Sequence, residues 1–113
     1  MADCLLCKIV TKEIDSDIVY ESDGTIAFRD INPGAPTHVL VIPKRHVASA
    51  AELGASQGDE LGELFAAINA VATDASLDGG FRVVTNVGPD AGQSVHHLHF
   101  HVLGGRSMAW PPG

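Results

Sequence analysis

Residues 94–103 read Ser-Val-His-His-Leu-His-Phe-His-Val-Leu, and the fold of the chain can be worked out from this stretch. Four of the six histidines of the chain lie within it. In a β-strand, alternate side chains point to opposite faces, so His97, His99 and His101 share one face. The residues between them, His96 included, point the other way and are mostly apolar. We therefore predict a strand with three imidazoles on one face and core packing on the other.

A row of three imidazoles is better suited to chemistry than to packing, because rings that become charged repel each other. Imidazole is a nucleophile, a proton carrier near neutral pH and a metal ligand. The row of histidines by itself is compatible with three functions. They are a catalytic site that uses a histidine nucleophile, a catalytic zinc hydrolase with these three rings as ligands, and a binding or scaffolding module.

The length of 113 residues predicts a single domain over residues 1–113. No run approaches the ~20 apolar residues that a membrane-spanning helix needs, and the N-terminus does not resemble a secretory leader. We therefore expect a cytoplasmic protein without a membrane partner.

The formal net charge is −7, and the seven basic residues are scattered along the chain. A nucleic-acid backbone is bound by a clustered basic face, so we expect no nucleic-acid partner. For the same reason, a bound phosphate is expected to be held by backbone N–H groups and imidazoles rather than by lysines and arginines.

Both cysteines lie in Cys4-Leu-Leu-Cys7. A disulfide is disfavoured in a reducing compartment, and the βαβ context of a thioredoxin-like pair does not follow. Half of a zinc site and a pair of free thiols remain as alternatives, since zinc needs two more ligands and histidines are available elsewhere.

Hydrophobic periodicity and turn signals predict an α+β fold with an antiparallel sheet of about five strands, one long helix and one or two short ones. The strands are expected at residues 18–20, 26–28, 37–42, 81–87 and 94–103. Short helices are expected at residues 7–13 and 47–54, and a capping box at residues 56–59 opens the long helix. The last two strands should form a hairpin that brings Asn86 and the glycine-rich loop beside the histidine row.

The motif His97-Leu-His-Phe-His-Val-Leu103 resembles the signature of the histidine-triad nucleotide-binding family. Four further segments resemble that family in the same order. They are Asp30-Ile-Asn-Pro33 with Ala35-Pro-Thr-His38, Ile42-Pro-Lys-Arg-His46, Asn86 with Gly92-Gln-Ser-Val95, and a tail from Gly104 to Gly113 that is similar to the Hint branch. The resemblance covers nearly the whole chain.

The resemblance implies a homodimeric α+β hydrolase that binds purine nucleotides such as AMP or GMP and cleaves nucleoside 5′-phosphoramidates. It implies that His99 is the nucleophile of a covalent nucleotidyl-histidine, with no cofactor for catalysis. His101 and the Ser94 hydroxyl are the candidates for handling the proton of the leaving amine. The nucleotide-binding residues that it implies are Asp30, Ile31, Asn86, Gly92, Gln93, Ser94, His99 and His101.

The same resemblance implies a structural zinc ion held by Cys4, Cys7, His46 and His97, which would occupy His97. It also implies that the tail, residues 107–113, packs across the dimer. His96 stands where an aromatic is common in the branch, and we interpret it as a structural or surface residue. His38 is either a core histidine or a residue that supports the site. The rival activities are a dinucleoside polyphosphate hydrolase and a nucleotide-binding regulatory module.

Overall fold

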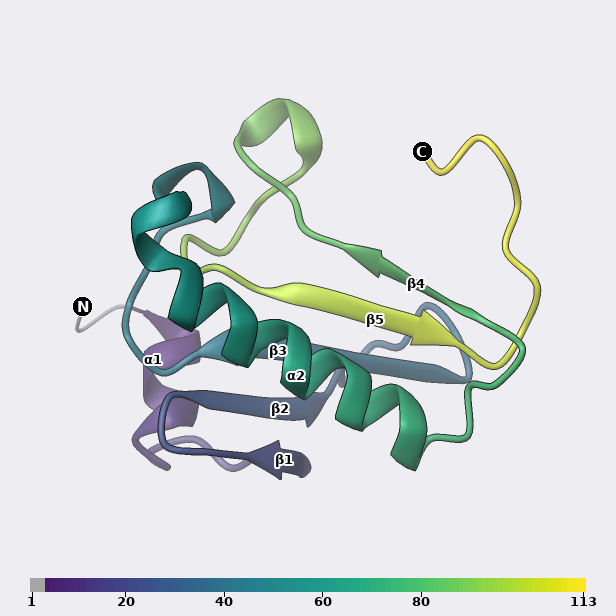
Figure 1. Cartoon of the computed structure of the whole chain (residues 1–113), viewed down its shortest axis with the longest axis horizontal. Helices are drawn as coiled ribbons and strands as arrows, with labels where there is room; N and C mark the ends of the chain where they lie inside the picture. The colour runs from purple at the N-terminus through teal and green to yellow at the C-terminus, as the bar shows by residue number, and fades with distance from the viewer. Residues whose placement is uncertain (1–3) are drawn as a thin grey trace.

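The computed structural model describes residues 4–113, and its centre is a five-stranded sheet with helices on both faces (Figure 1). Neighbouring strands follow the order β1-β2-β3-β5-β4, and all four pairings are antiparallel. The strands are β1 (Ile18–Glu21), β2 (Thr25–Arg29), β3 (Thr37–Pro43), β4 (Phe81–Val84) and β5 (Phe100–Gly104). The predicted α+β class, the antiparallel sheet and the hairpin of the last two strands are confirmed.

The long helix α2 (Gly58–Asp74) crosses one face of the sheet, and the short helix α1 (Leu5–Val10) lies on the other (Figure 1). Strand β3 shows the two faces by alternation. Val39 and Val41 pack in the cluster under α2, whereas Ile42, with Leu40 against it, belongs to the cluster beside α1. Three 3-10 turns complete the fold, at Ala50–Glu52, Ala55–Gln57 and Pro89–Ala91.

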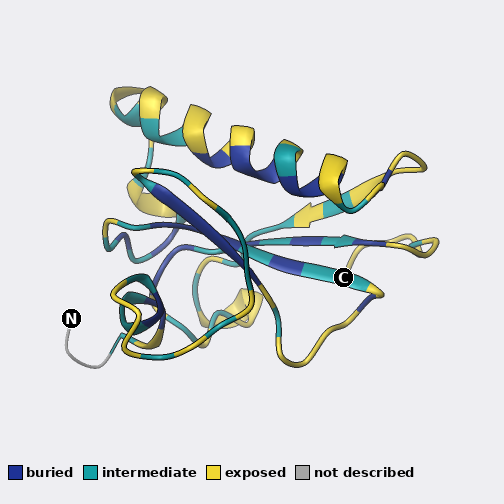
Figure 2. Ribbon diagram, turned by 90° about the horizontal axis from the view of Figure 1, so that it is seen from below, coloured by how far each residue is buried: buried dark blue, intermediate teal, exposed yellow. Residues whose placement is uncertain are grey.

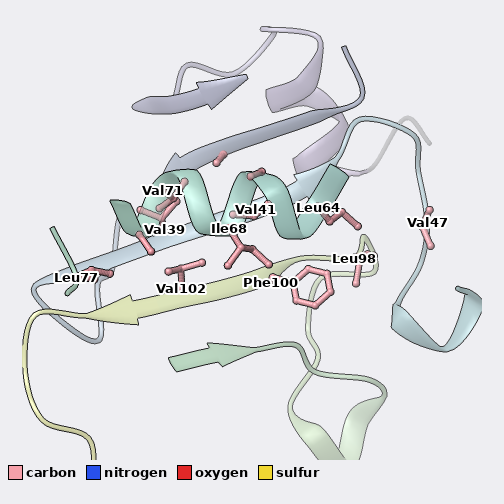
Figure 3. Close-up of a cluster of buried hydrophobic side chains, with 13 residues drawn as sticks. Val39, Val41, Val47, Leu64, Ile68, Val71, Leu77, Leu98, Phe100 and Val102 are labelled. Carbon is pink, nitrogen blue, oxygen red and sulfur yellow. The ribbon is translucent and has the colours of Figure 1, made fainter. Parts of the chain in front are cut away.

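The core under α2 is built from apolar residues at helical spacing on one side of that helix. Leu64, Ile68 and Val71 are almost fully buried against the sheet, and Figure 3 shows them facing Val39, Val102 and Phe100. Figure 2 shows the opposite side of the helix exposed to solvent. Burying one such side chain contributes roughly 1.5–3 kcal/mol, so this layer is a main source of the stability that holds β5 in place.

The short helices differ from the predictions at their ends. Helix α1 begins earlier than expected because the thiol of Cys4 caps it, accepting a hydrogen bond from the Cys7 N–H at 3.2 Å. The segment 47–54 forms only the 3-10 turn Ala50–Glu52, so the helix predicted there is wrong. The capping box predicted at residues 56–59 is also wrong, because α2 begins at Gly58 and the Gln57 side chain reaches back to the Gly54 N–H instead.

The histidine row is only partly a strand. Strand β5 begins at Phe100, and the chain bends at residues 95–97, so His97 and His99 precede the sheet. The reason is that β4 ends at Val84, which pairs with His101. Beyond that pair the Thr85 hydroxyl, not a backbone ladder, donates to the His99 carbonyl at 2.9 Å. The predicted alternation still holds for Leu98, Phe100 and Val102, which all lie in the core under α2. His96 is exposed at the bend.

Within residues 4–113, no helix is both long enough and apolar enough to cross a membrane.

Candidate active site and metal centre

A cleft of about 500 Å³ opens beside α1, on the face of the sheet opposite α2. One wall is apolar and the other carries the polar groups of the histidine row and of the loop after β2. The apolar wall contains Leu5, Leu6, Ile9, Phe28 and Leu40, and the polar wall contains Asp30, Ser94, His99 and His101. Ile31 stands at the rim and is 90% exposed. Such a cleft suits a ligand with a flat apolar part and a polar part.

His99 is oriented by the backbone of its own segment. Its Nδ1 lies 2.7 Å from the carbonyl oxygen of His97. A carbonyl only accepts, so Nδ1 carries the proton and the neutral ring has its lone pair on Nε2. The ring borders the cleft, with its centroid 5.1 Å from that of His101. An imidazole held in this way has the protonation state that a nucleophile requires.

His101 belongs to a second group, which we call the donor cluster and which consists of Asp30, His38 and His101. His38 Nε2 lies 2.8 Å from His101 Nδ1, and the Gly34 N–H donates to His38 Nδ1 at 2.9 Å. The Asp30 Oδ2 atom lies 3.5 Å from His38 Nε2. Burial and the neighbouring His99 and His38 rings lower the pKa of His101 to about 4, so this ring is neutral at pH 7.

Asp30 closes the loop after β2 and faces the cleft. Its Oδ1 accepts the Asn32 N–H at 2.8 Å, and its own N–H donates to the His38 carbonyl at 2.9 Å. The carboxylate is therefore fixed next to the exposed Ile31 side chain, where both border the same opening.

The glycine-rich loop is arranged differently from the prediction. The N–H groups of Gly92 and Gln93 donate within the turn, to the carbonyls of Pro89 and Gly88. The Gln93 amide accepts from the Gly88 N–H and donates to the carbonyls of Ala48 and Val95. The N–H groups of Gly92 and Gln93 are therefore both used within the turn in this structure. These two residues order the loop and thereby place Ser94 at the cleft.

Gly92 has a φ of 86°, a left-handed backbone conformation that glycine adopts without strain. Asn86 follows Thr85, whose hydroxyl binds the His99 carbonyl, so it lies at the His99 end of the hairpin. Asn86, Gly92 and Gln93 are not among the described residues that border the cleft.

Four side chains that the sequence offered as zinc ligands meet behind α1, and we call them the metal cluster: Cys4, Cys7, His46 and His97. Their ligand atoms all lie within 4.8 Å of one another. Cys4 Sγ is 3.3 Å from His97 Nδ1, and Cys7 Sγ is 3.3 Å from His46 Nδ1.

The donor set of the metal cluster fits zinc. His97 donates from Nε2 to the Pro43 carbonyl at 2.9 Å, which leaves the Nδ1 lone pair directed at the thiols. Burial and the adjacent Cys4 raise the pKa of the Cys7 thiol to about 11. Two crowded thiols resist ionisation unless a cation neutralises them, and two thiolates with two imidazoles form a closed tetrahedral zinc site.

The three histidines of the row do not converge on one metal. Among residues 4–113, ligand atoms gather in the metal cluster and the donor cluster, and neither contains all three rings. A catalytic zinc held by His97, His99 and His101 is therefore contradicted by the directions of the side chains.

Comparison with known proteins identifies the family of this chain. The family model of the HIT domain matches residues 11–108. The chain belongs to the HIT, or histidine-triad, family. A HIT-like protein of Synechococcus elongatus is 50% identical over 98% of this chain and 97% of its own length. A 14 kDa zinc-binding protein of Brassica juncea is 47% identical over 98% of this chain and its entire length.

A solved structure, that of a HIT family hydrolase from Legionella pneumophila, has a TM-score of 0.95 with 43% identity, covering 98% of this chain and 100% of that one. The match covers nearly all of both chains, so this HIT chain has the fold of the Legionella structure.

The residues that sequence analysis missed are mainly those of the apolar wall. Leu5 is 48% exposed although it lies on a short helix of mostly apolar residues. The sequence does indicate this wall, because Leu5 and Leu6 are adjacent apolar residues and a six-residue helix cannot bury both of them in one core. The sequence left the role of His38 open between a core histidine and a residue that supports the site; the structure places its Nε2 2.8 Å from Nδ1 of His101.

Proposed function

We propose that this HIT protein is a purine nucleotide-binding hydrolase that cleaves the P–N bond of nucleoside 5′-phosphoramidates through His99. The observation that supports this most is the ring of His99, with its Nδ1 proton held by the His97 carbonyl and its Nε2 lone pair free at the polar wall of the cleft. A hydrolase activity is also suggested by the name of the similar Legionella protein.

The cleft accommodates the parts of such a substrate in order. The base lies against the apolar wall formed by α1 and Phe28, with Ile31 over its edge. The Asp30 carboxylate accepts hydrogen bonds from the ribose hydroxyls. The α-phosphate then reaches Ser94, His99 and His101, while Asn86, Gly92 and Gln93 shape the loop around it.

The reaction proceeds in two displacements at phosphorus. The His99 Nε2 lone pair attacks the α-phosphorus, an N–P bond forms, and the bond to the amine breaks. The amine departs after taking a proton, for which the Ser94 hydroxyl and His101 are the candidates at the cleft. Water then attacks the same phosphorus and releases a proton that replaces the one taken by the amine; the His99–phosphorus bond breaks, and the nucleoside monophosphate leaves with neutral His99 restored. Fixed donors stabilise the charge that develops on the phosphate oxygens.

Zinc supplies no step in this scheme. When bound by Cys4, Cys7, His46 and His97, it neutralises two thiolates and joins α1 to the sheet. Cys7 lies in α1 and Cys4 caps it, and α1 also forms part of the apolar wall, so the metal cluster supports base binding indirectly.

A homodimer is part of the proposal. Strand β4 is an edge strand, and it exposes Phe81 and Val83 at 38% and 37%. Trp110 in the tail is 83% exposed, and one Arg82 hydrogen bond to the Ala109 carbonyl ties the tail to β4. An edge strand with exposed apolar side chains and an exposed tryptophan is suited to pair with a second copy. We expect deletion of residues 107–113 to change substrate preference more than stability.

The deciding experiment is to trap the intermediate. The protein is mixed with adenosine 5′-phosphoramidate and quenched, and its peptides are analysed by mass spectrometry. We expect an adenylyl group on the peptide spanning residues 94–106, located at His99, and none in the His99→Ala variant. The His96→Ala variant is the matched control, because this exposed ring lies outside the cleft. Turnover without an adduct in either protein, or an adduct on another residue, would contradict the proposal. Faster cleavage of a dinucleoside polyphosphate would favour the rival activity.

A further inference from the structure

We infer that His38 is a positioning residue that fixes His101 with its proton on Nε2, so that the neutral ring serves as a permanent hydrogen-bond donor to the phosphate and not as a proton source. The inference rests on the proposed function for its substrate. The arrangement of the two rings is independent of that substrate and can be tested without it.

The first link is the bond from Gly34 to His38. The backbone N–H of Gly34 donates to His38 Nδ1 at 2.9 Å. A nitrogen that accepts an N–H has a free lone pair, so Nδ1 is unprotonated and the single proton of this ring is on Nε2. A backbone amide cannot reverse its role, so it selects one tautomer of His38.

The second link is the hydrogen bond between His38 and His101, which fixes the tautomer of His101. The Nε2–H of His38 faces two acceptors, His101 Nδ1 at 2.8 Å and Asp30 Oδ2 at 3.5 Å. Only the shorter distance is that of a well-formed hydrogen bond, so the Nε2–H group of His38 donates to Nδ1 of His101. His101 Nδ1 is therefore an acceptor, and the neutral His101 ring carries its proton on Nε2.

The third link is the position of His101 itself. Its ring is packed between His38 and His99, with both centroid separations at 5.1 Å, and it borders the cleft. Burial keeps it neutral at pH 7, as its lowered pKa indicates. The Nε2–H group is thus available to an acceptor in the cleft, where the proposed function places a phosphate oxygen.

The chain of donors ends at His38, and this limits what His101 can do. If His101 gave its Nε2 proton to the leaving amine, a proton would have to enter at Nδ1 from His38. His38 has no donor behind it other than a backbone amide, which does not ionise. Proton transfer would leave an imidazolate, so donation of a hydrogen bond is the role that the geometry permits. Between the two candidates for the amine proton, the choice then falls on the exposed hydroxyl of Ser94, which takes a proton from a water molecule as it gives its own and so is not left as an alkoxide.

A divalent cation is the competing occupant of the donor cluster, because its ligand atoms also lie within 4.8 Å of one another. Such an ion would need the lone pair of His38 Nε2. That nitrogen carries the proton as long as Gly34 donates to Nδ1. The backbone amide therefore favours the hydrogen-bonded arrangement over metal binding.

The test reads the tautomer directly. Long-range ¹H–¹⁵N spectra of the ¹⁵N-labelled wild-type chain, without substrate at neutral pH, should show Nδ1 unprotonated and Nε2 protonated in both His38 and His101. In His38→Gln, the amide nitrogen can replace Nε2 as a donor, so the His101 pattern should persist. In His38→Leu, no donor remains and His101 should populate both tautomers.

Turnover of adenosine 5′-phosphoramidate provides the second readout. We expect His38→Gln to stay near the wild-type rate and His38→Leu to fall at least about tenfold, because a catalytic ring in the wrong tautomer loses its function. Unfolding curves of both variants show whether the fold is intact. If the leucine variant does not fold, the wild-type spectrum alone decides.

A protonated Nδ1 on wild-type His101 would overturn the inference, as would equal turnover and equal His101 spectra in the two variants. Selective broadening of the His38 and His101 signals by Mn²⁺ would overturn it in favour of a metal site. The expected tautomers together with no cleavage of the phosphoramidate would refute the proposed function and leave the positioning role intact.

Discussion

The metal cluster and the donor cluster lie on either side of His99, and they differ in what stands opposite their ring nitrogens. In the metal cluster, Nδ1 of His46 and of His97 face cysteine thiols. In the donor cluster, Nδ1 of His38 faces a backbone N–H and Nδ1 of His101 faces another ring. A histidine is thus suited to bind a metal in one cluster and to donate a hydrogen bond in the other, because the group opposite the ring sets which nitrogen is protonated.

Mutations in the two clusters are therefore expected to change different properties of the protein. The metal cluster should act on stability through α1, whereas the donor cluster should act on turnover and nucleotide binding. Variants in each cluster therefore sharpen the contrast, and His99, which touches both, provides the reference.

The largest effect is expected for His99→Ala. Turnover of adenosine 5′-phosphoramidate should fall by on the order of 10⁴-fold or more, because the nucleophile is removed. Zinc content and AMP affinity should remain close to those of the wild type, since neither cluster loses a member. Steady-state kinetics, metal analysis and calorimetry measure the three quantities, with His96→Ala as the control. Turnover within tenfold of the wild type would assign the nucleophile to another residue.

The second effect is expected in the metal cluster. Replacing Cys4 and Cys7 together by serine should abolish zinc binding and lower the free energy of unfolding by several kcal/mol, roughly 3 or more, because metal binding is coupled to folding. Denaturant unfolding and metal analysis measure the effect. Wild-type protein stripped by a chelator and reloaded with zinc is the control. Wild-type protein that contains no stoichiometric zinc when purified without chelator would instead support two free thiols.

The donor cluster should respond to Asp30→Asn in the opposite way. We expect AMP to bind about tenfold more weakly, because a charged acceptor for the ribose hydroxyls is lost. Zinc content should not change, and the free energy of unfolding should shift by less than about 1 kcal/mol, since the carboxylate is near the surface. Asp74→Asn, an exposed position at the end of α2, is the matched control. A loss of stability larger than the loss of affinity would make Asp30 a structural residue.

The smallest effect is the pH dependence that His101 adds to stability. Its folded-state pKa of about 4 lies below the ordinary value of 6.5, so the unfolded chain takes up a proton first as the pH falls. Above pH 6.5 the ring of His101 adds no pH dependence to the stability. As the pH falls from 6.5 to about 4, the free energy of unfolding decreases. Unfolding of the wild type and of His101→Gln at pH 7 and pH 4.5 isolates it, because both share the metal cluster. Equal losses in the two proteins would show that His101 does not contribute.

The architecture could be predicted from sequence patterns because the residues within each helix or strand largely determine its type. The continuous apolar run within residues 37–43 indicates a strand buried on both faces, and the 3.6-residue period of α2 indicates a helix with one buried side. Cys4 and Cys7 could also be predicted as half of a zinc site, since they are three residues apart and zinc has a small set of preferred donors, whereas His46 and His97 were implied only by the family resemblance.

The end of β4 and the directions of individual hydrogen bonds could not be predicted. Whether His99 belongs to a strand depends on pairing with a distant segment, which stops at Val84. The N–H groups of Gly92 and Gln93 were free by sequence but are used within the turn. The tautomer of each ring depends on one atom from elsewhere in the chain, as the Gly34 amide shows for His38.

Residue 97 serves the protein with two chemically independent parts. Its ring faces the thiols, and its main-chain oxygen aligns His99. Every amino acid has that oxygen, so the alignment of the nucleophile does not require a histidine at this position. A descendant of this chain could exchange its cysteines and the imidazole at 97 for apolar side chains, dispense with zinc, and inherit the reacting ring in its present orientation.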